Sequence, residues 1–151
     1  MLLAEALAER AEAQRRLEQV QVRIHRILRV QEGEDPPESP DKVLTEMDKI
    51  LDRLQMLVRR INKTNSVTAI DDYQSIADAI TFRDIALKRR KLYSEIATRA
   101  STTPKRYRGS ELKDVSTVAT NDLQQEVDRI SDYCCELDTK VQKLSWQVQL
   151  L

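Results

Sequence analysis

Apolar residues recur at alternating steps of four and three along residues 121–151. This spacing is an unbroken heptad seam, and it predicts a helix over 121–149 that packs against other helices. Read as heptad positions, the a sites hold valine and cysteine and the d sites are mostly leucine. The seam consists of Leu123, Val127, Ile130, Cys134, Leu137, Val141, Leu144, Val148 and Leu151.

Three earlier segments also have helical periodicity, over residues 2–30, 40–62 and 75–100. The first ends where a glycine and three prolines stop helical propagation, within residues 32–40. Ser39 and Pro40 suit an N-cap and the first position of the second helix. Because residues 101–119 have no helical periodicity, they predict a long ordered loop.

The segment 40–62 has two apolar stripes side by side. One is a seam that continues along the whole segment, made of Val43, Met47, Ile50, Leu54, Leu57 and Ile61. The other consists of Leu44, Leu51 and Val58. A helix with so wide an apolar surface is expected to be covered on two sides, by its own bundle and by another subunit.

The segment 75–100 begins with Ser75 and Asp78, which resemble a capping box. Its seam is poorer than the others, because Arg89 and Arg99 occupy seam positions. The residues that align on it are Phe82, Ile85, Leu92 and Ile96, while Ile76, Ile80 and Leu87 lie off it.

The composition supports an all-α protein. Charged residues make up 33% of the 151 residues, with two glycines, four prolines and 4% aromatic residues. This balance is typical of long amphipathic helices and poor for a β-sandwich. We therefore expect a single helical domain over 1–151, an antiparallel bundle of four long helices with coiled-coil-like packing and an oligomeric state.

Neither the net charge, the two cysteines nor the single histidine indicates a particular chemistry. The net charge is zero, so no overall field draws the molecule to nucleic acid or to an anionic membrane. Cys134 and Cys135 are neighbours whose side chains diverge by about 100° on a helix, so a pairing between them is not expected. His25, the single histidine, lies next to Ile24 and is expected to be partly buried rather than a ligand. No cofactor is expected.

The first residues and the hydropathy predict a cytoplasmic protein. Glu5, Glu9 and Arg10 interrupt the apolar start of the chain, unlike a secretion signal. No segment approaches the roughly 20 apolar residues that cross a bilayer, so no membrane span is expected.

Several short motifs resemble one bacterial family. They are the residues 3–7, 30–34, 60–65, Arg106 with Tyr107, 110–113, 115–118, and 137–139 with Gln142, Leu144 and Trp146. Together they resemble the septicolysin-like proteins, a largely uncharacterised family, over nearly the whole chain. The resemblance implies kinship and a shared fold. The cytolysin role that the family name implies is not expected here, because the sequence has no export signal, membrane-length apolar segment or disulfide framework.

An enzyme reading rests on carboxylates spaced three or four apart. Helical nucleotide pyrophosphohydrolases bind Mg²⁺ in this way, since the spacing places two oxygens on one helix face. The matching pairs are Glu9 with Glu12, Asp48 with Asp52, and Glu111 with Asp114. Most highly charged helices would match as well.

A nucleic-acid reading rests on the basic residues of 88–91 and 105–113, where Tyr107 could stack on a base. The zero net charge and the few aromatic residues weigh against it. A small anion, if one binds, is expected near donors from two segments: Arg106, Tyr107, Arg108, Asn62 and Asn65.

The reading that uses most of the sequence is a structural or interaction protein that assembles with itself, or docks another protein, through helical seams. The candidate assembly seam comprises the surplus apolar residues of the second and fourth helices: Leu44, Leu51, Val58, Val141, Leu144, Trp146, Val148 and Leu151. Whether the fourth helix pairs within one subunit or between subunits stays open.

A further hypothesis is that the acidic loop 32–41 meets the basic stretch 105–113 across a subunit boundary and sets its register. Two independent solvated loops are the simpler alternative.

Overall fold

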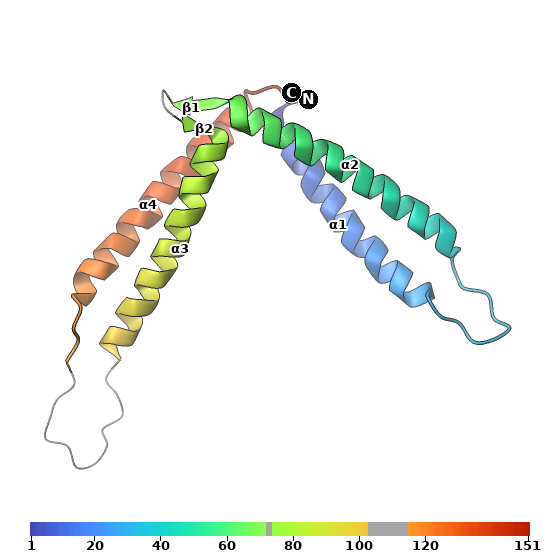
Figure 1. Ribbon diagram of the computed structural model, residues 1–151, viewed down its shortest axis with the longest axis horizontal. Coiled ribbons are helices and arrows are strands. Elements are labelled where there is room, and N and C mark those ends of the chain that lie inside the picture. Colours follow the sequence, from blue (N-terminus) through green and yellow to red (C-terminus); the bar gives the residue numbers. More distant parts are fainter. Residues whose placement is uncertain (72–73, 103–114) are drawn as a thin grey trace, which may run out of the picture. The chain divides into compact units, whose positions relative to one another are not determined.

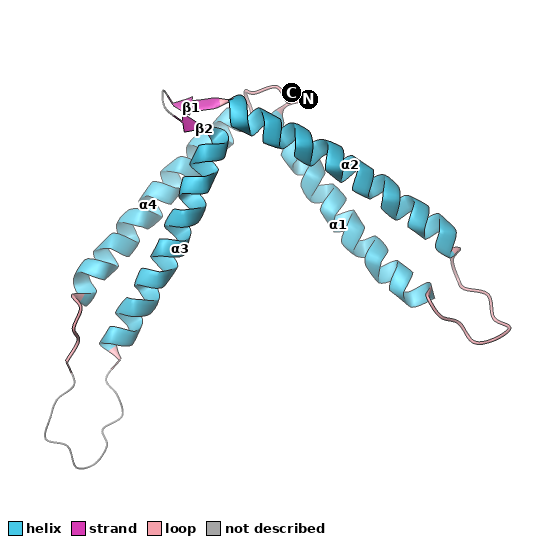
Figure 2. Cartoon of the chain, in the orientation of Figure 1, coloured by secondary structure: helices cyan, strands magenta, loops and turns pink. Residues whose placement is uncertain are grey.

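The computed structural model describes residues 1–71, 74–102 and 115–151. In these residues the chain is mostly helical, which confirms the coarse fold prediction, and it also contains a small two-stranded sheet (Figure 1). The elements are α1 (Leu3–Ile27), α2 (Pro40–Val67), β1 (Ala69–Asp71), β2 (Gln74–Ser75), α3 (Ile76–Ser101) and α4 (Thr120–Ser145). Figure 2 distinguishes the helices and strands from the connecting loops.

The chain divides into two compact units. The first comprises Met1–Ala69 with Gln142–Leu151, and the second comprises Ile70–Val141. The expected single domain over 1–151 stays a prediction.

In the first unit, α1 and α2 run side by side and bury a shared apolar seam (Figure 1). The buried cluster consists of Ala13, Val20, Ile24, Ile27, Val43 and Ile50, with Leu17, Met47 and Leu54 packed against it. These residues recur every three or four positions, so each helix presents one face to the other. The first seam predicted for residues 40–62 is therefore the one that is buried.

Ion pairs fix the register of α1 against α2. Arg23 is hydrogen-bonded to Glu38 before α2 and, at 2.9 Å, to Glu46 on α2. The bonds to Glu38 and Glu46 raise the pKa of Arg23, and Arg23 holds the pKa of Glu38 below its usual range. Further along, Arg53 contacts Glu9 at 2.5 Å. Because Glu38 pairs within this unit, at least one carboxylate of the acidic loop already has a partner.

The last residues of the chain close the open end of this unit. The predicted helix over 121–149 ends at Ser145, and after a turn at residues 146–147 the chain pairs with the residues at the start of α1. The Leu3 amide donates to the Val148 carbonyl at 2.9 Å, and the Leu150 amide donates to the Met1 carbonyl at 3.0 Å. Leu150 is buried there, so the terminal apolar residues cap a core rather than extend a heptad seam.

Thr64 joins α2 to the same segment. Its hydroxyl donates to the Arg60 carbonyl at 2.9 Å and accepts from the Leu151 amide at 3.0 Å. Arg60 also donates to the main-chain oxygens of Leu150 and Leu151. The threonine is fully buried, and the hydroxyl satisfies an amide that would otherwise lack a partner.

The predicted 40–62 helix runs on to Val67, through the polar residues expected to end it. Hydroxyls near the end of α2 donate to carbonyls of the same helix: the Ser66 hydroxyl donates to the Lys63 carbonyl, and the Thr68 hydroxyl donates to the Thr64 carbonyl. Such bonds satisfy side chains inside a helix as well as in a turn, so the polar cluster did not force an end.

In the second unit, β1 and β2 lead directly into α3. The Ser75 hydroxyl accepts from the Asp78 amide at 3.1 Å, and the Asp78 carboxylate accepts from the Ser75 amide at 3.0 Å. The predicted capping box is therefore present. The Ser75 hydroxyl also donates to the Asp78 carboxylate at 2.7 Å. This bond and the one from the Ser75 amide lower the pKa of Asp78 from its ordinary value of 3.8, so their stabilising effect is present at neutral pH and is lost as the pH falls through that lowered pKa.

α3 and α4 run antiparallel, linked by polar contacts. Arg83 donates to Asp138 at 2.8 Å, and Arg90 donates to Ser131 at 3.3 Å. The bonds to Asp138 and to Asp84 raise the pKa of Arg83. On α4 the heptad seam is buried as expected over its middle, at Val127, Ile130, Cys134 and Leu137.

The seam predicted for α3 is wrong. The four residues expected to align on it, Phe82, Ile85, Leu92 and Ile96, are exposed. Ile76, which was placed off the seam, is buried, together with Ala79 and Ala97. Alanines let the two helices approach closely, and the arginines beside them find partners on α4, so this face forms the contact although it is less apolar.

The cap of α3 gives a stability prediction. Replacing Ser75 with Ala removes the acceptor for the Asp78 amide, so the free energy of unfolding is expected to fall by ~1 kcal/mol. Urea denaturation followed by circular dichroism measures the change. Ser94→Ala, inside the same helix and exposed, is the matched control and should leave stability nearly unchanged; an equal effect of both variants would contradict the capping role.

The buried hydroxyl of Thr64 gives a second stability prediction. Thr64→Val keeps the shape but leaves the Leu151 amide without its acceptor, at a cost of about 1–3 kcal/mol. Hydrogen exchange at that amide should accelerate, as measured by NMR. Thr45→Val, on an exposed turn of α2 where the hydroxyl bonds the Asp41 carbonyl, should change stability by no more than about 0.5 kcal/mol.

Candidate functional site

Among the described residues of the second unit, the outward face of α3 has the largest row of exposed apolar side chains. Phe82, Ile85, Leu92 and Ile96 are between 43% and 58% exposed. They follow one another at heptad steps, with Arg89 at the central position. We call these five residues the α3 stripe. Its spacing is that of a helix prepared to pack against another helix, yet α4 covers a different face of α3.

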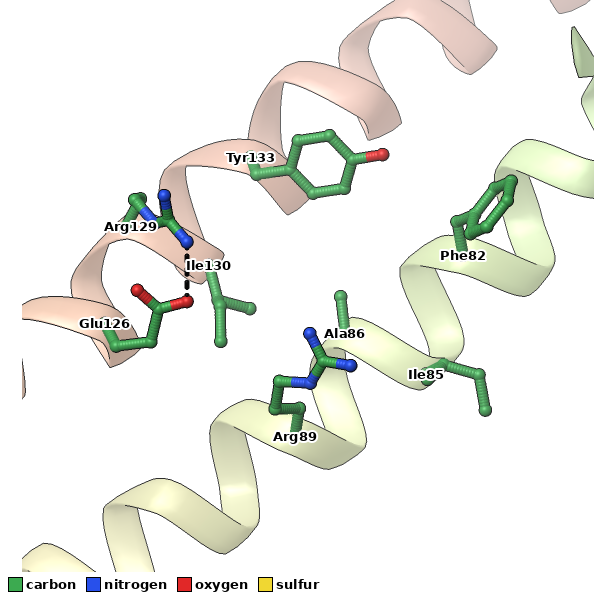
Figure 3. A pocket seen from close by; sticks show the side chains of 8 residues that line it. All are labelled: Phe82, Ile85, Ala86, Arg89, Glu126, Arg129, Ile130 and Tyr133. Carbon is green, nitrogen blue, oxygen red and sulfur yellow. Dashed lines mark hydrogen bonds and ion pairs between the residues drawn. The ribbon is translucent and has the colours of Figure 1, made fainter. Parts of the chain in front are cut away.

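A groove runs beside the α3 stripe, between α3 and α4 (Figure 3). It has a volume of about 360 Å³ and is lined by Phe82, Ile85, Ala86, Arg89, Glu126, Arg129, Ile130 and Tyr133. Figure 3 shows Ala86 and Ile130 pointing toward each other from the two helices. The small alanine leaves the space, and the ring of Tyr133, 46% exposed, borders it.

The charged groups of the groove differ in how they are satisfied. Arg129 donates to Glu126 at 2.8 Å, and this bond raises the pKa of Arg129. Arg89 is exposed and has no hydrogen-bond or ion-pair partner among the described residues. The groove therefore has an apolar floor and one cation available to an incoming group.

A second apolar stripe lies on α2, in the first unit. Leu44, Leu51 and Val58 are between 38% and 42% exposed, whereas the neighbouring seam of α2 is buried against α1. We call these three residues the α2 stripe. On its side away from α1 the helix has Asp41, Asp48 and Asp52, all exposed, so the flank is mainly acidic.

The rest of the predicted assembly seam is only partly available. Val141, Leu144 and Val148 are half-buried, and Val148 belongs to the segment that pairs with the start of α1. Trp146 and Leu151 are 59% and 50% exposed. The α2 part of the predicted seam thus lies on an open surface, and most of the α4 part does not.

The predicted anion site is only partly within the described residues. Arg106, Tyr107 and Arg108, like all of residues 103–114, lie outside them, as does the basic stretch 105–113. Asn62 is exposed and Asn65 is half-buried on α2. The basic run 88–91 lies on α3 and is exposed throughout.

The carboxylate pairs considered for Mg²⁺ are either paired with arginines, exposed, or outside the described residues. Glu9 pairs with Arg53 and Glu12 pairs with Arg15, while Asp48 and Asp52 are exposed on α2. Glu111 and Asp114 lie outside the described residues. Across residues 1–71, 74–102 and 115–151, no group of three or more histidine, cysteine or acidic side chains is placed to hold a metal ion.

The remaining candidates for chemistry are isolated residues. Cys134 is buried in the α4 seam, and its neighbour Cys135 is exposed; both are free thiols. His25 is exposed on α1, contrary to the partly buried position expected for it. In the part of the chain that the structure describes, no helix combines the length and apolar character needed to span a membrane.

Residues 10–150 match a family described as "Family of unknown function (DUF6847)". The chain belongs to this family. A solved structure, titled "Crystal structure of a functionally unknown conserved protein from Corynebacterium diphtheriae", has 41% sequence identity and a TM-score of 0.91. The similarity covers 100% of this chain and 99% of that chain. No curated protein matches the sequence.

Sequence reasoning missed the exposed α3 stripe, although one signal pointed to it. Ala79, Ala86 and Ala97 also fall on one side of α3, and a row of small residues is typical of two helices in close contact. On α3, the row of small residues is therefore a better guide to the inner face than the largest apolar residues.

Proposed function

We propose that this protein of the DUF6847 family is a structural or interaction protein that assembles with itself through helical seams. The observation that carries the proposal is the α3 stripe, where four large apolar side chains at heptad spacing are about half exposed. Exposed apolar patches of this kind mark interaction sites in soluble proteins. The α2 stripe adds a second surface of the same kind.

The expected contact is helix on helix, with coiled-coil-like packing. Heptad spacing keeps one stripe in line with another over several turns, so each side chain enters a gap between side chains of the facing helix. Covering the remaining half of an exposed Phe, Ile or Leu contributes ~1 kcal/mol per side chain. A stripe of four supplies enough apolar surface for a reversible contact, and a second stripe makes a stable assembly reachable.

The proposal includes a cytoplasmic setting and no cofactor. Two free thiols are typical of a reducing compartment, where disulfides do not persist. The resemblance to septicolysin-like proteins remains a hypothesis of kinship and contributes no activity. Neither the Mg²⁺-dependent nucleotide hydrolase nor the nucleic-acid reading gains a specific observation from the described residues.

The native mass in solution tests the proposal. Light scattering across a range of protein concentrations should give a multiple of 17.5 kDa. The double variant Phe82→Ser with Leu92→Ser should shift the mass toward the monomer, because it removes apolar contact area from the α3 stripe while circular dichroism stays helical.

The matched control is Val22→Ser with Leu28→Ser. These side chains are exposed to a similar extent, at 53% and 64%, but belong to α1 and the residue after it. The control should keep the native mass. A wild-type protein that stays monomeric at every concentration would overturn the proposal, and an unchanged mass in the α3 variant would remove the stripe from it.

A further inference from the structure

We propose that the α3 stripe of one copy packs against the α2 stripe of a second copy, with Arg89 of the first facing Asp48 of the second. This inference rests on the proposed self-assembly and names the two surfaces that meet. The occupant of each stripe is thus another copy of this chain, and the charges on the two helices are the reason.

Pairing the α3 stripe with itself would bring like charges together. The stripe runs from residue 82 to residue 96, and Arg89 lies at its middle. In a parallel pair Arg89 meets the Arg89 of the other copy. In an antiparallel pair centred on the stripe, the middle again meets the middle. Like charges across a contact disfavour association by several kcal/mol, so this pairing is not favoured.

The α2 stripe has the opposite charge on its flank. Asp41, Asp48 and Asp52 lie beside Leu44, Leu51 and Val58, with Arg59 as the basic residue of that flank. Two α2 stripes would therefore bring acidic groups together. The pairing of an α2 stripe with an α3 stripe joins apolar surface to apolar surface and brings the acidic flank of α2 to Arg89, which electrostatic complementarity favours.

The spacing of the two helices also matches. On α2 the series Leu44, Asp48, Leu51 advances by four and then three residues, and on α3 the series Ile85, Arg89, Leu92 advances in the same way. Aligning the two series places Ile85 opposite Leu44 and Leu92 opposite Leu51, with Arg89 opposite Asp48. In the reversed orientation Arg89 would lie opposite Leu51 and Asp48 opposite Leu92, so the proposed Arg89–Asp48 contact is that of the parallel orientation.

Asp48 and Arg89 are both free to make this contact. Each is exposed, and neither has a hydrogen-bond or ion-pair partner among the described residues. By contrast, the other two charges of the α3–α4 groove, Glu126 and Arg129, are bonded to each other. Arg89 is therefore the cation of the groove that can donate hydrogen bonds to a carboxylate from outside.

Charge reversal in two separate chains tests the inference. Asp48→Arg alone and Arg89→Asp alone should each weaken association at least about tenfold, because each creates a like-charge contact. An equal mixture of the two variants should recover the native mass, since each like-charged contact is replaced by an attractive one. The double variant with both changes in one chain should recover it too. Light scattering and sedimentation give the masses.

Lys91→Asp is the control, because it changes the same charge on α3 about 200° around the helix from Arg89. It should leave association nearly unchanged.

If both single variants dissociate and neither the mixture nor the double variant recovers the native mass, the pairing is wrong while self-assembly stands. If only the double variant recovers, the contact lies within one chain. If neither single variant dissociates, the Arg89–Asp48 contact is excluded, whereas a monomeric wild type would overturn the proposed function itself.

Discussion

The constraint on which this structure depends is that a helical hairpin covers one face of each of its helices. A helix whose apolar residues extend around more than one face must leave part of them exposed unless something else covers them. α2 buries Ile50 and Leu57 and leaves Leu51 and Val58 exposed beside them. α3 buries alanines and leaves Phe82 and larger aliphatic residues outside. Both units thus have apolar surface left over for contacts outside the hairpin.

Polar contacts hold each hairpin in register, so the exposed apolar residues of α2 and α3 occupy defined positions. Arg83 reaches Asp138 across the α3–α4 pair, and Arg23 bridges Glu38 and Glu46 beside the α1–α2 core. Partly exposed ion pairs contribute little stability, but they select one alignment out of several. Because the alignment is fixed, the α3 stripe has the same residues outward in every molecule, which a specific interface requires.

The charges divide between the exposed stripes in a way that favours unlike partners. Arg89 lies in the middle of the α3 stripe, and Asp48 lies in the α2 series at the matching position. Net charge is zero, so this difference is local and does not arise from the composition. Charge of this kind contributes more to the choice of partner and register than to affinity, for which the apolar side chains are responsible. The solved structure from Corynebacterium diphtheriae, similar over the full chain, offers a second protein in which to compare the same positions.

The sequence by itself determined the helical class, the number of long helices, the N-cap of α3 at Ser75 and the buried heptad on α4. Each of these depends on local spacing or capping, which the chain order contains. Tertiary structure alone decided which face of α3 meets α4. The face with the alanines, Arg83 and Arg90 packs against α4 although another face is more apolar, because it allows closer approach and makes hydrogen bonds to α4. Tertiary structure also decided that Val148 leaves the heptad, because the amide of Leu3, far away in sequence, binds its carbonyl. Periodicity reports how residues are spaced on a helix, whereas the choice between neighbouring faces depends on the partner that the fold brings to it.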